Sequence, residues 1–185
     1  VRARAGDRIL DIGCGTGELL AYLPHGVHYA GWDISAEYVA AARARFGTRG
    51  VFTCGLITPD AVAALPPFDI VVASGVLHHL DDDEGRAFAR LARRALRHGG
   101  RVATIDPVVA PGQHPLAAYL IARDRGQHVR SPDGYLALLR DAFSDVHGVV
   151  RHRRWVPYTH WMMEAGTGQA DTAELSDGPN AQRRS

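Results

Sequence analysis

The sequence predicts an α/β fold in which a mostly parallel sheet carries helices on both faces. Strand-like and helix-like segments alternate from residue 8 to residue 106, as they do in chains that wind successive strands into one parallel sheet. The apolar runs 8–13 and 68–73 are nearly continuous, which is typical of strands buried on both faces. A glycine-rich turn follows the first run directly and indicates the point where a strand passes into a helix.

The first half of the chain supplies three strands, each followed by a helix. The expected strands are 8–13, 27–33 and 51–54, and the expected helices are 18–23, 36–46 and 59–65. Ser35 is a natural N-cap, because its hydroxyl can accept a hydrogen bond from the first turn of the second helix. Pro24 and Gly26 end the first helix, and the pair Pro66-Pro67 ends the third.

The second half supplies the remaining strands. They are expected at 68–73, 101–105, 145–152 and 155–163. A long helix is expected over 83–98, with apolar residues on one face and arginines on the other, and Gly99-Gly100 should cap it. The strand at 101–105 ends on Asp106, which places this carboxylate at the edge where parallel strands finish.

Length and composition favour one soluble domain. The chain has 185 residues, of which 46% are apolar, enough for a single sizeable core. We expect this domain to span 1–165, whereas 166–185 is small and polar and is expected to be a disordered tail. The chain opens at Val1 without a Met, and we expect an N-terminal piece to precede it.

Charge and cysteine content exclude several classes of protein. The net charge is +1 and the pI about 8.1, so no global field favours nucleic acid or an anionic membrane as the partner. No apolar run approaches the ~20 residues that a membrane span needs. Cys14 and Cys54 are too few for a disulfide framework and form no metal-type pair, so we expect a cytoplasmic protein without a metal.

The glycine-rich turn is the first candidate binding site. It follows the acidic residue Asp11 and places Gly13, Gly15 and Gly17 within five positions. Glycines without side chains let a ligand approach the main chain, while amides at the start of the next helix point toward it. The segment is therefore expected to hold a nucleotide-like ligand.

Three acidic residues narrow the choice of ligand. Asp33 comes sixteen residues after Gly17, at the end of the second strand, where a carboxylate can accept both hydroxyls of a ribose. A dinucleotide fingerprint needs Gly or Ala at position 18, but this chain has Glu18, which would repel phosphates. Asp11 and Glu18 together suit a cationic or zwitterionic group. The pattern therefore favours an adenosyl amino acid over a nicotinamide dinucleotide.

Five segments together resemble the class I S-adenosylmethionine-dependent methyltransferases. They are residues 9–17, 31–35, 68–71, 75–80 and 99–101. The resemblance covers roughly residues 6–106 and implies S-adenosylmethionine as cofactor. It also implies a Rossmann-like three-layer sandwich whose seven-stranded, mostly parallel sheet has an antiparallel last strand.

The same resemblance implies which residues contact the cofactor. The glycine turn would hold the methionine moiety, Asp33 the ribose, and Ser74 or Gly75 the amino acid end. One position departs from the family pattern, because many relatives carry Gly-Asp after the third strand, whereas here Leu56 follows Gly55. The complete expected set is Asp11, Gly13, Cys14, Gly15, Gly17, Asp33, Ile34, Ser35, Gly55, Leu56, Ser74 and Gly75.

Methyl transfer chiefly requires alignment of the acceptor with the methyl group, and a base is needed only for an acceptor such as a hydroxyl. His78 and His79 follow the fourth strand, and Asp106 ends the fifth strand at the same edge. In similar enzymes that act on sugars, quinones and natural products, a His in this motif is a plausible base with an acid at the next strand end. We therefore expect His78 to act as the base with Asp106, and His79 is the second candidate. The alternative for either histidine is packing at a helix start.

The acceptor is expected to be a small molecule, methylated on oxygen without a metal. Methyltransferases that modify nucleic-acid amino groups carry Asn/Asp-Pro-Pro-aromatic after the fourth strand, where this chain has Ser74-Gly75-Val76-Leu77. The fold class places an acceptor-binding insertion at 107–135, and its charged block 123–130 either contacts an anionic acceptor or is a solvated helix end. A carbon-directed methyltransferase, a non-catalytic cofactor-binding module and a nicotinamide oxidoreductase are the alternatives.

Overall fold

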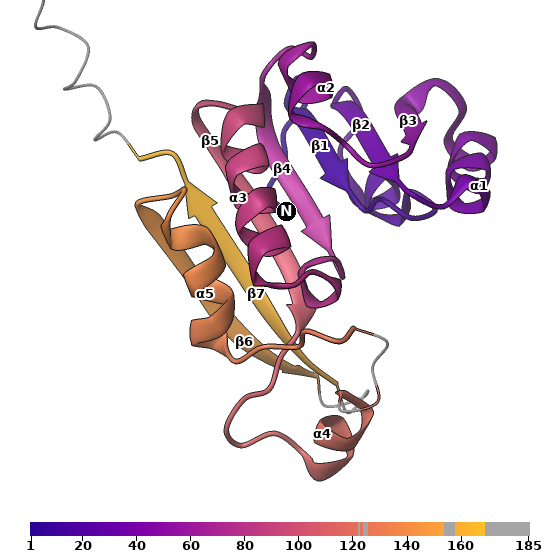
Figure 1. The fold of residues 1–185 in the computed structure, drawn as a ribbon. Coiled ribbons are helices and arrows are strands. Elements are labelled where there is room, and N and C mark those ends of the chain that lie inside the picture. Colours follow the sequence, from indigo (N-terminus) through magenta and orange to yellow (C-terminus); the bar gives the residue numbers. More distant parts are fainter. Residues whose placement is uncertain (122, 124–125, 154–157, 169–185) are drawn as a thin grey trace, which may run out of the picture.

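A twisted central sheet flanked by helices dominates the computed structural model of the chain (Figure 1). The structure describes residues 1–121, 123, 126–153 and 158–168. Seven strands pair in the order β3-β2-β1-β4-β5-β7-β6. This order confirms the expected α/β architecture and brings β1, the strand before the glycine turn, to a position between β2 and β4.

The strands follow one another much as the sequence predicts. Their bounds are β1 Arg8–Ile12, β2 His28–Asp33, β3 Gly50–Cys54, β4 Phe68–Ser74, β5 Leu96–Pro107, β6 Asp145–Arg153 and β7 Tyr158–Gly166. The five strands from β3 to β5 in the sheet order are parallel, whereas β7 runs antiparallel to both of its neighbours, β5 and β6. The antiparallel last strand is thus confirmed.

Helices and short 3-10 turns connect the strands. They are η1 Glu18–Tyr22, α1 Ala36–Phe46, η2 Gly47–Arg49, α2 Pro59–Ala63, η3 Leu77–His79, α3 Asp82–Ala95, α4 Pro115–Ile121 and α5 Pro132–Arg140. Ser35 caps α1 as expected, since its hydroxyl accepts a hydrogen bond from the Tyr38 amide at 3.3 Å. The first predicted helix is present only as the 3-10 turn η1.

Two apolar clusters lie on the two faces of the sheet. One packs α2, α3 and α5 against it through side chains such as Phe88 and Leu138. The other packs η1 and α1 through side chains such as Leu20 and Val39. In the part of the chain that the structure describes, no helix has the length and apolar character needed to cross a bilayer.

The end of α3 differs from the sequence-based expectation. The helix ends at Ala95, and the residues expected to finish and cap it belong to β5. Phe68 pairs with Leu96 but Ile70 pairs with Arg101, so β5 bulges between these two pairs. Gly99 has φ 73° within the bulge, a conformation that glycine adopts without strain. Strand pairing outweighs the helical pattern here.

The region after β5 projects beyond the carboxyl end of that strand and carries α4 (Figure 1). It includes most of the predicted insertion 107–135, and α5 begins within its last residues. Nearly all of the predicted tail, from residue 169 onward, lies outside the described residues. The domain bounds of 1–165 stay a prediction.

The N-terminus of α3 carries a reciprocal cap that gives a test of the fold. The Asp81 carboxylate accepts a hydrogen bond from the Glu84 amide, and the Glu84 carboxylate accepts one from the Asp81 amide, both at 2.9 Å. We expect Asp81→Ala to lower the free energy of unfolding by about 1 kcal/mol in urea titrations, because the first turn loses its acceptor. The exposed neighbour Asp83→Ala is the control and should change this free energy by less than half as much. Equal effects would show that the cap is not important.

Candidate functional site

The carboxyl ends of β1, β2, β4 and β5 meet at one edge of the sheet, and backbone hydrogen bonds join the turns that follow them. The Gly13 and Cys14 amides donate to the Trp32 carbonyl at 2.7 and 3.0 Å, which ties the glycine turn to the end of β2. The Gly75 amide donates to the Ile105 carbonyl at 2.7 Å and ties the turn after β4 to β5. The structure therefore gathers the expected site residues along one continuous edge.

The three glycines of the turn share a positive φ but face different surroundings. A Cβ on Gly13 would lie 2.5 Å from a methyl carbon of Val76, and one on Gly17 would lie 3.0 Å from the Phe46 ring. A Cβ on Gly15 would meet no atom within 4 Å. Gly13 and Gly17 thus permit close packing inside the protein, and Gly15 faces open space that a ligand can enter.

Asp33 fastens the glycine turn to the start of α1. Its Oδ2 accepts a hydrogen bond from the Gly15 amide and its Oδ1 one from the Ser35 amide, each at 2.8 Å. A carboxylate oxygen has two lone pairs, so each oxygen retains one for a further donor. The partly buried Asp33 is therefore both a brace for the turn and an available acceptor beside it.

Asp11 is a buried carboxylate with incomplete hydrogen bonding. It is 2% exposed, and its Oδ2 accepts a hydrogen bond of 2.5 Å from the Tyr29 hydroxyl. Its Oδ1 is buried and has no hydrogen-bond partner among the described groups. The pKa of Asp11 is raised to about 6. Burial is the main cause of the increase and the charge of Asp33 adds to it, while the hydrogen bond from the Tyr29 hydroxyl offsets part of it. A cation beside Asp11 would relieve this unfavourable burial.

Sequence reasoning missed Tyr29, because only the register of β1 and β2 places its hydroxyl against Asp11. Tyr29 pairs with Ile9, two residues before Asp11, and the tyrosine reaches along the strand. The sequence predicted the strand that carries Tyr29 but contained no signal for this hydrogen bond.

Glu18 and Cys14 take less direct parts in the turn than their positions suggest. The Glu18 carboxylate is exposed and forms an ion pair with Arg45, which balances its charge. Cys14 is buried, and desolvation raises the pKa of its thiol to about 12, so the thiol is neutral at physiological pH. Cys14 fills space beside Gly31, where a Cβ would lie 2.8 Å from the sulfur.

Two large apolar side chains flank the same edge and are exposed. Ile34 is 72% exposed after β2, and Leu56 is 81% exposed after β3. Gly55 lies between these two strand ends, and its amide donates to the Asp33 carbonyl at 2.8 Å. Ser74 and Gly75 are exposed at the end of β4. The expected cofactor residues at the ends of β2, β3 and β4 thus border an accessible surface, whereas Asp11 and Cys14 are buried.

His78 and Asp106 come into direct contact, as the sequence predicts for a His/Asp pair. Nδ1 of His78 lies 2.9 Å from Oδ1 of Asp106, and the His78 amide donates to the same oxygen at 3.2 Å. Both residues are buried, with 6% and 1% of their surfaces exposed. A Cβ on Gly75 would lie 3.7 Å from Cε1 of His78, so the imidazole packs next to Gly75, one of the expected cofactor-binding residues.

His79 lies beside this pair but points into a different environment. It is exposed, and its ring centroid lies 4.0 Å from that of His78. No group of three or more potential metal ligands occurs among the residues placed in the structure.

A family model described as a methyltransferase domain matches residues 10–102, half of the chain. The chain belongs to the class I S-adenosylmethionine-dependent methyltransferases. S-adenosylmethionine is the cofactor of this family. The match covers the glycine turn, Asp33 and the His78 turn of the methyltransferase domain and ends shortly before Asp106.

Two curated methyltransferases are similar to this chain over more than half of its length. This chain is 38% identical over 154 residues to 27-O-demethylrifamycin SV methyltransferase of Amycolatopsis mediterranei, and the match covers 75% of this chain and 54% of that protein. This chain is also 37% identical over 117 residues to aklanonic acid methyltransferase of Streptomyces sp. strain C5, and that match covers 60% of this chain and 52% of the relative. The chain thus spans about half the length of these relatives.

A solved structure shows the same fold as the methyltransferase domain. Magnesium protoporphyrin IX methyltransferase from Synechocystis PCC 6803, with bound S-adenosylhomocysteine, superposes with a TM-score of 0.67 at 19% identity. The superposition covers 89% of this chain and 75% of that one. At this identity the similarity concerns the fold alone.

The raised pKa of Asp11 predicts a specific pH dependence of stability. Between its ordinary value of 3.8 and the folded value of about 6, the folded state holds a proton that the unfolded state releases. Stability from this group is therefore present at low pH and is lost as pH rises through 6, by up to about 3 kcal/mol. We expect Asp11→Asn to raise the free energy of unfolding above pH 6 and to have little such effect near pH 4.

Urea unfolding at several pH values between 4 and 8 measures this difference. The exposed Asp60→Asn is the matched control, because it removes a carboxylate that lies outside the core. A gap between Asp11→Asn and the unsubstituted chain that stays constant across this range would contradict the assignment.

Proposed function

We propose that this domain binds S-adenosylmethionine over the glycine turn and transfers the methyl group to an oxygen atom of a small organic molecule, with His78 as general base. The observation that carries the proposal is the contact between His78 and Asp106 directly behind Gly75. A potential base close to the expected cofactor site supports the proposal. S-adenosylmethionine, when bound, supplies a methyl group already activated by a positive sulfonium.

The residues present fit this cofactor. The unpartnered Oδ1 of Asp11 is buried next to the turn and suits the positive charge of an amino acid ammonium. The remaining lone pairs of Asp33 suit the two hydroxyls of a ribose, while the amides on Gly15 and Ser35 hold the carboxylate in place. Open space at Gly15 admits the ligand to the main chain.

Apolar side chains at the strand ends fit the flat face of an adenine. Ile34 after β2 and Leu56 after β3 are both exposed, so their side chains can contact a ligand. Leu56 replaces the acid that many relatives carry at this position. We therefore assign adenine binding to apolar contact and to backbone groups, not to a carboxylate.

The Asp106 carboxylate prepares His78 to remove a proton. A carboxylate facing Nδ1 favours the tautomer with a proton on this nitrogen, which leaves Nε2 as the proton acceptor. Transfer of a hydroxyl proton to Nε2 makes the oxygen a better nucleophile, and Asp106 stabilises the imidazolium that results. Burial excludes water from the pair and strengthens their interaction.

The proposed class of acceptor is inferred from the names of two relatives and from the exposed apolar residues around α4. One relative is named for methylation of 27-O-demethylrifamycin SV and another for aklanonic acid, and the first name specifies an oxygen acceptor. The helix α4 lies beyond the carboxyl end of β5 (Figure 1). Several apolar side chains in and before this helix are exposed. They are Val109, Leu116, Tyr119 and Leu120. Such a patch suits a large, mostly apolar acceptor.

Loss of the ribose acceptor should weaken cofactor binding. We expect Asp33→Ala to raise the Kd of S-adenosylmethionine at least tenfold, because two buried hydroxyl contacts and the brace on the turn are lost. Isothermal titration calorimetry measures the Kd, and Asp60→Ala serves as the control. Circular dichroism must show that the variant is folded. Wild-type affinity in a folded Asp33→Ala would overturn the cofactor site.

Loss of the base should reduce turnover without changing cofactor affinity. We expect His78→Ala to lower kcat about 100-fold or more with 27-O-demethylrifamycin SV as probe acceptor, since a positioned base contributes on the order of 10²–10⁴. Mass spectrometry of the methylated product measures the rate. The exposed His147→Ala should retain the full rate.

Two outcomes would contradict this mechanism. Unchanged turnover in His78→Ala would remove the general base from it. Tight cofactor binding with no methylation of the probe or of a panel of phenols and alcohols would instead favour the non-catalytic binding module.

A further inference from the structure

We propose that Arg130 is a positioning residue that holds the His78 imidazole in the orientation needed for proton removal. The inference rests on the proposed function of His78, but its structural basis is independent of any acceptor. Arg130 is the last residue of the charged block 123–130 in the predicted insertion and comes 52 positions after His78 in the chain. Its side chain nevertheless reaches the turn that carries His78.

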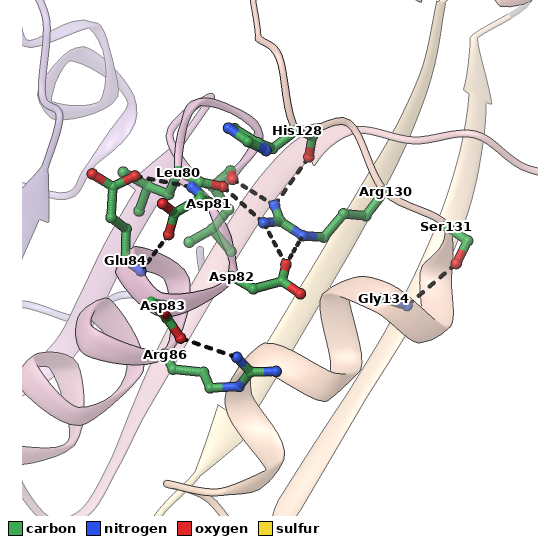
Figure 2. A network of polar contacts seen from close by, with 11 residues as sticks. Leu80, Asp81, Asp82, Asp83, Glu84, Arg86, His128, Arg130, Ser131 and Gly134 are labelled. Atoms are coloured by element: carbon green, nitrogen blue, oxygen red, sulfur yellow. Dashed lines mark hydrogen bonds and ion pairs between the residues drawn. The ribbon is translucent and has the colours of Figure 1, made fainter.

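The Arg130 guanidinium uses all of its nitrogen atoms in this contact (Figure 2). Nη1 donates to the Leu77 carbonyl at 2.9 Å, and Nη2 donates to the Leu80 carbonyl at 2.7 Å. Nε and Nη2 donate to Oδ1 of Asp82 at 3.1 and 2.9 Å, and Nη1 also donates to the His128 carbonyl at 3.0 Å. The side chain is only 10% exposed.

These acceptors surround a very short element. The turn η3 contains only Leu77, His78 and His79, and the Leu80 amide closes it by donating to the Leu77 carbonyl at a long 3.2 Å. Arg130 supplies donors to the carbonyls on both sides of the histidine pair and places a positive charge at the negative end of the turn. A lysine has one ammonium and cannot reproduce this planar arrangement of donors.

The segment that leads to Arg130 also contacts His78 itself. The His128 amide donates to the His78 carbonyl at 3.0 Å. Gly126 packs so tightly on His78 that a Cβ there would lie 2.0 Å from Cδ2 of the imidazole and 2.7 Å from the His78 carbonyl oxygen. Arg130 therefore anchors the segment 126–130, which restricts the orientation of the His78 imidazole from one side, while Asp106 contacts its Nδ1.

An ordinary surface ion pair does not account for this arrangement. Exposed pairs contribute little to stability, and the Asp82 side chain is 64% exposed. Three of the five Arg130 hydrogen bonds instead go to main-chain carbonyls, two of them in or directly after the histidine turn. Arg86 on α3, the helix that also carries Asp82, provides a contrast. It forms an ordinary surface ion pair with the exposed Asp83 at 3.5 Å (Figure 2).

The decisive measurement reports on His78 without any acceptor. Long-range ¹H–¹⁵N spectra of the full chain with S-adenosylhomocysteine resolve the imidazole nitrogens, and the spectrum of His78→Gln identifies the His78 signals. We expect Arg130→Gln and Arg130→Lys to shift the His78 Nδ1 and Nε2 signals toward a mixture of tautomers. The control Arg86→Gln should leave both signals at their wild-type positions.

A second variant covers the case in which both Arg130 substitutions prevent folding. Asp82→Asn removes a carboxylate that accepts two of the five hydrogen bonds and should move the His78 signals in the same direction by a smaller amount. Wild-type His78 signals in a folded Arg130 variant, or in Asp82→Asn where no Arg130 variant folds, would overturn the proposal. Equal shifts in Arg86→Gln would also overturn it.

Kinetics separates a positioning role from a merely structural one. We expect Arg130→Lys to lower kcat about 10- to 100-fold with the probe acceptor, while the KM for S-adenosylmethionine changes less than twofold. In a His78→Ala background the same substitution should change kcat less than twofold, because Arg130 acts through His78. Losses that multiply in the double variant would contradict the proposal.

The two proposals fail in distinguishable ways. Absence of S-adenosylmethionine binding or of methyl transfer by the unsubstituted chain would remove the proposed function, yet the histidine spectra would still decide whether Arg130 orients His78. Normal binding and turnover together with wild-type His78 signals in Arg130→Gln would remove only the inference about Arg130.

Discussion

Parallel pairing of β1 with β2 on one side and β4 on the other is the constraint on which the site depends. It brings the carboxyl ends of these strands to one edge and leaves the following turns without strand partners. The turns then hydrogen-bond to one another, as Gly13 does to Trp32 and Gly75 to Ile105. The expected functional groups lie at the ends of these strands or on turns braced in this way, so the sheet supplies the rigidity that an ordered site requires.

Three carboxylates, two of them buried, set the electrostatic character of this edge. Asp11, Asp33 and Asp106 lie at or near the ends of three strands, yet each is held differently. Asp33 accepts two main-chain amides, Asp106 contacts His78 at two atoms, and Asp11 receives only the Tyr29 hydroxyl. Asp11, which accepts the fewest hydrogen bonds of the three, thus lies next to the glycine turn. Its burial is unfavourable without a ligand, and this would favour the binding of a ligand that carries a positive charge.

Local patterns were sufficient to predict the sheet, its strand ends and the His78–Asp106 contact, because residues at the ends of neighbouring parallel strands must meet. Contacts that depend on side-chain reach were not predictable. The spacing of the glycines did not distinguish Gly15, which faces open space, from Gly13, which packs on Val76. Helical periodicity continued past Ala95, where pairing of Leu96 with Phe68 begins β5 instead. Arg130 stood in a charged block whose contacts depend on a distant turn.

The close packing of Gly13 against Val76 links two turns that the sequence separates by more than sixty residues. Val76 directly precedes η3, so the glycine turn and the turn that carries the histidine pair pack against each other through the Val76 side chain. No room remains for either turn to shift alone. If α4 binds the acceptor as proposed, a new acceptor preference can evolve there through side-chain changes that leave the contact between Gly13 and Val76 intact.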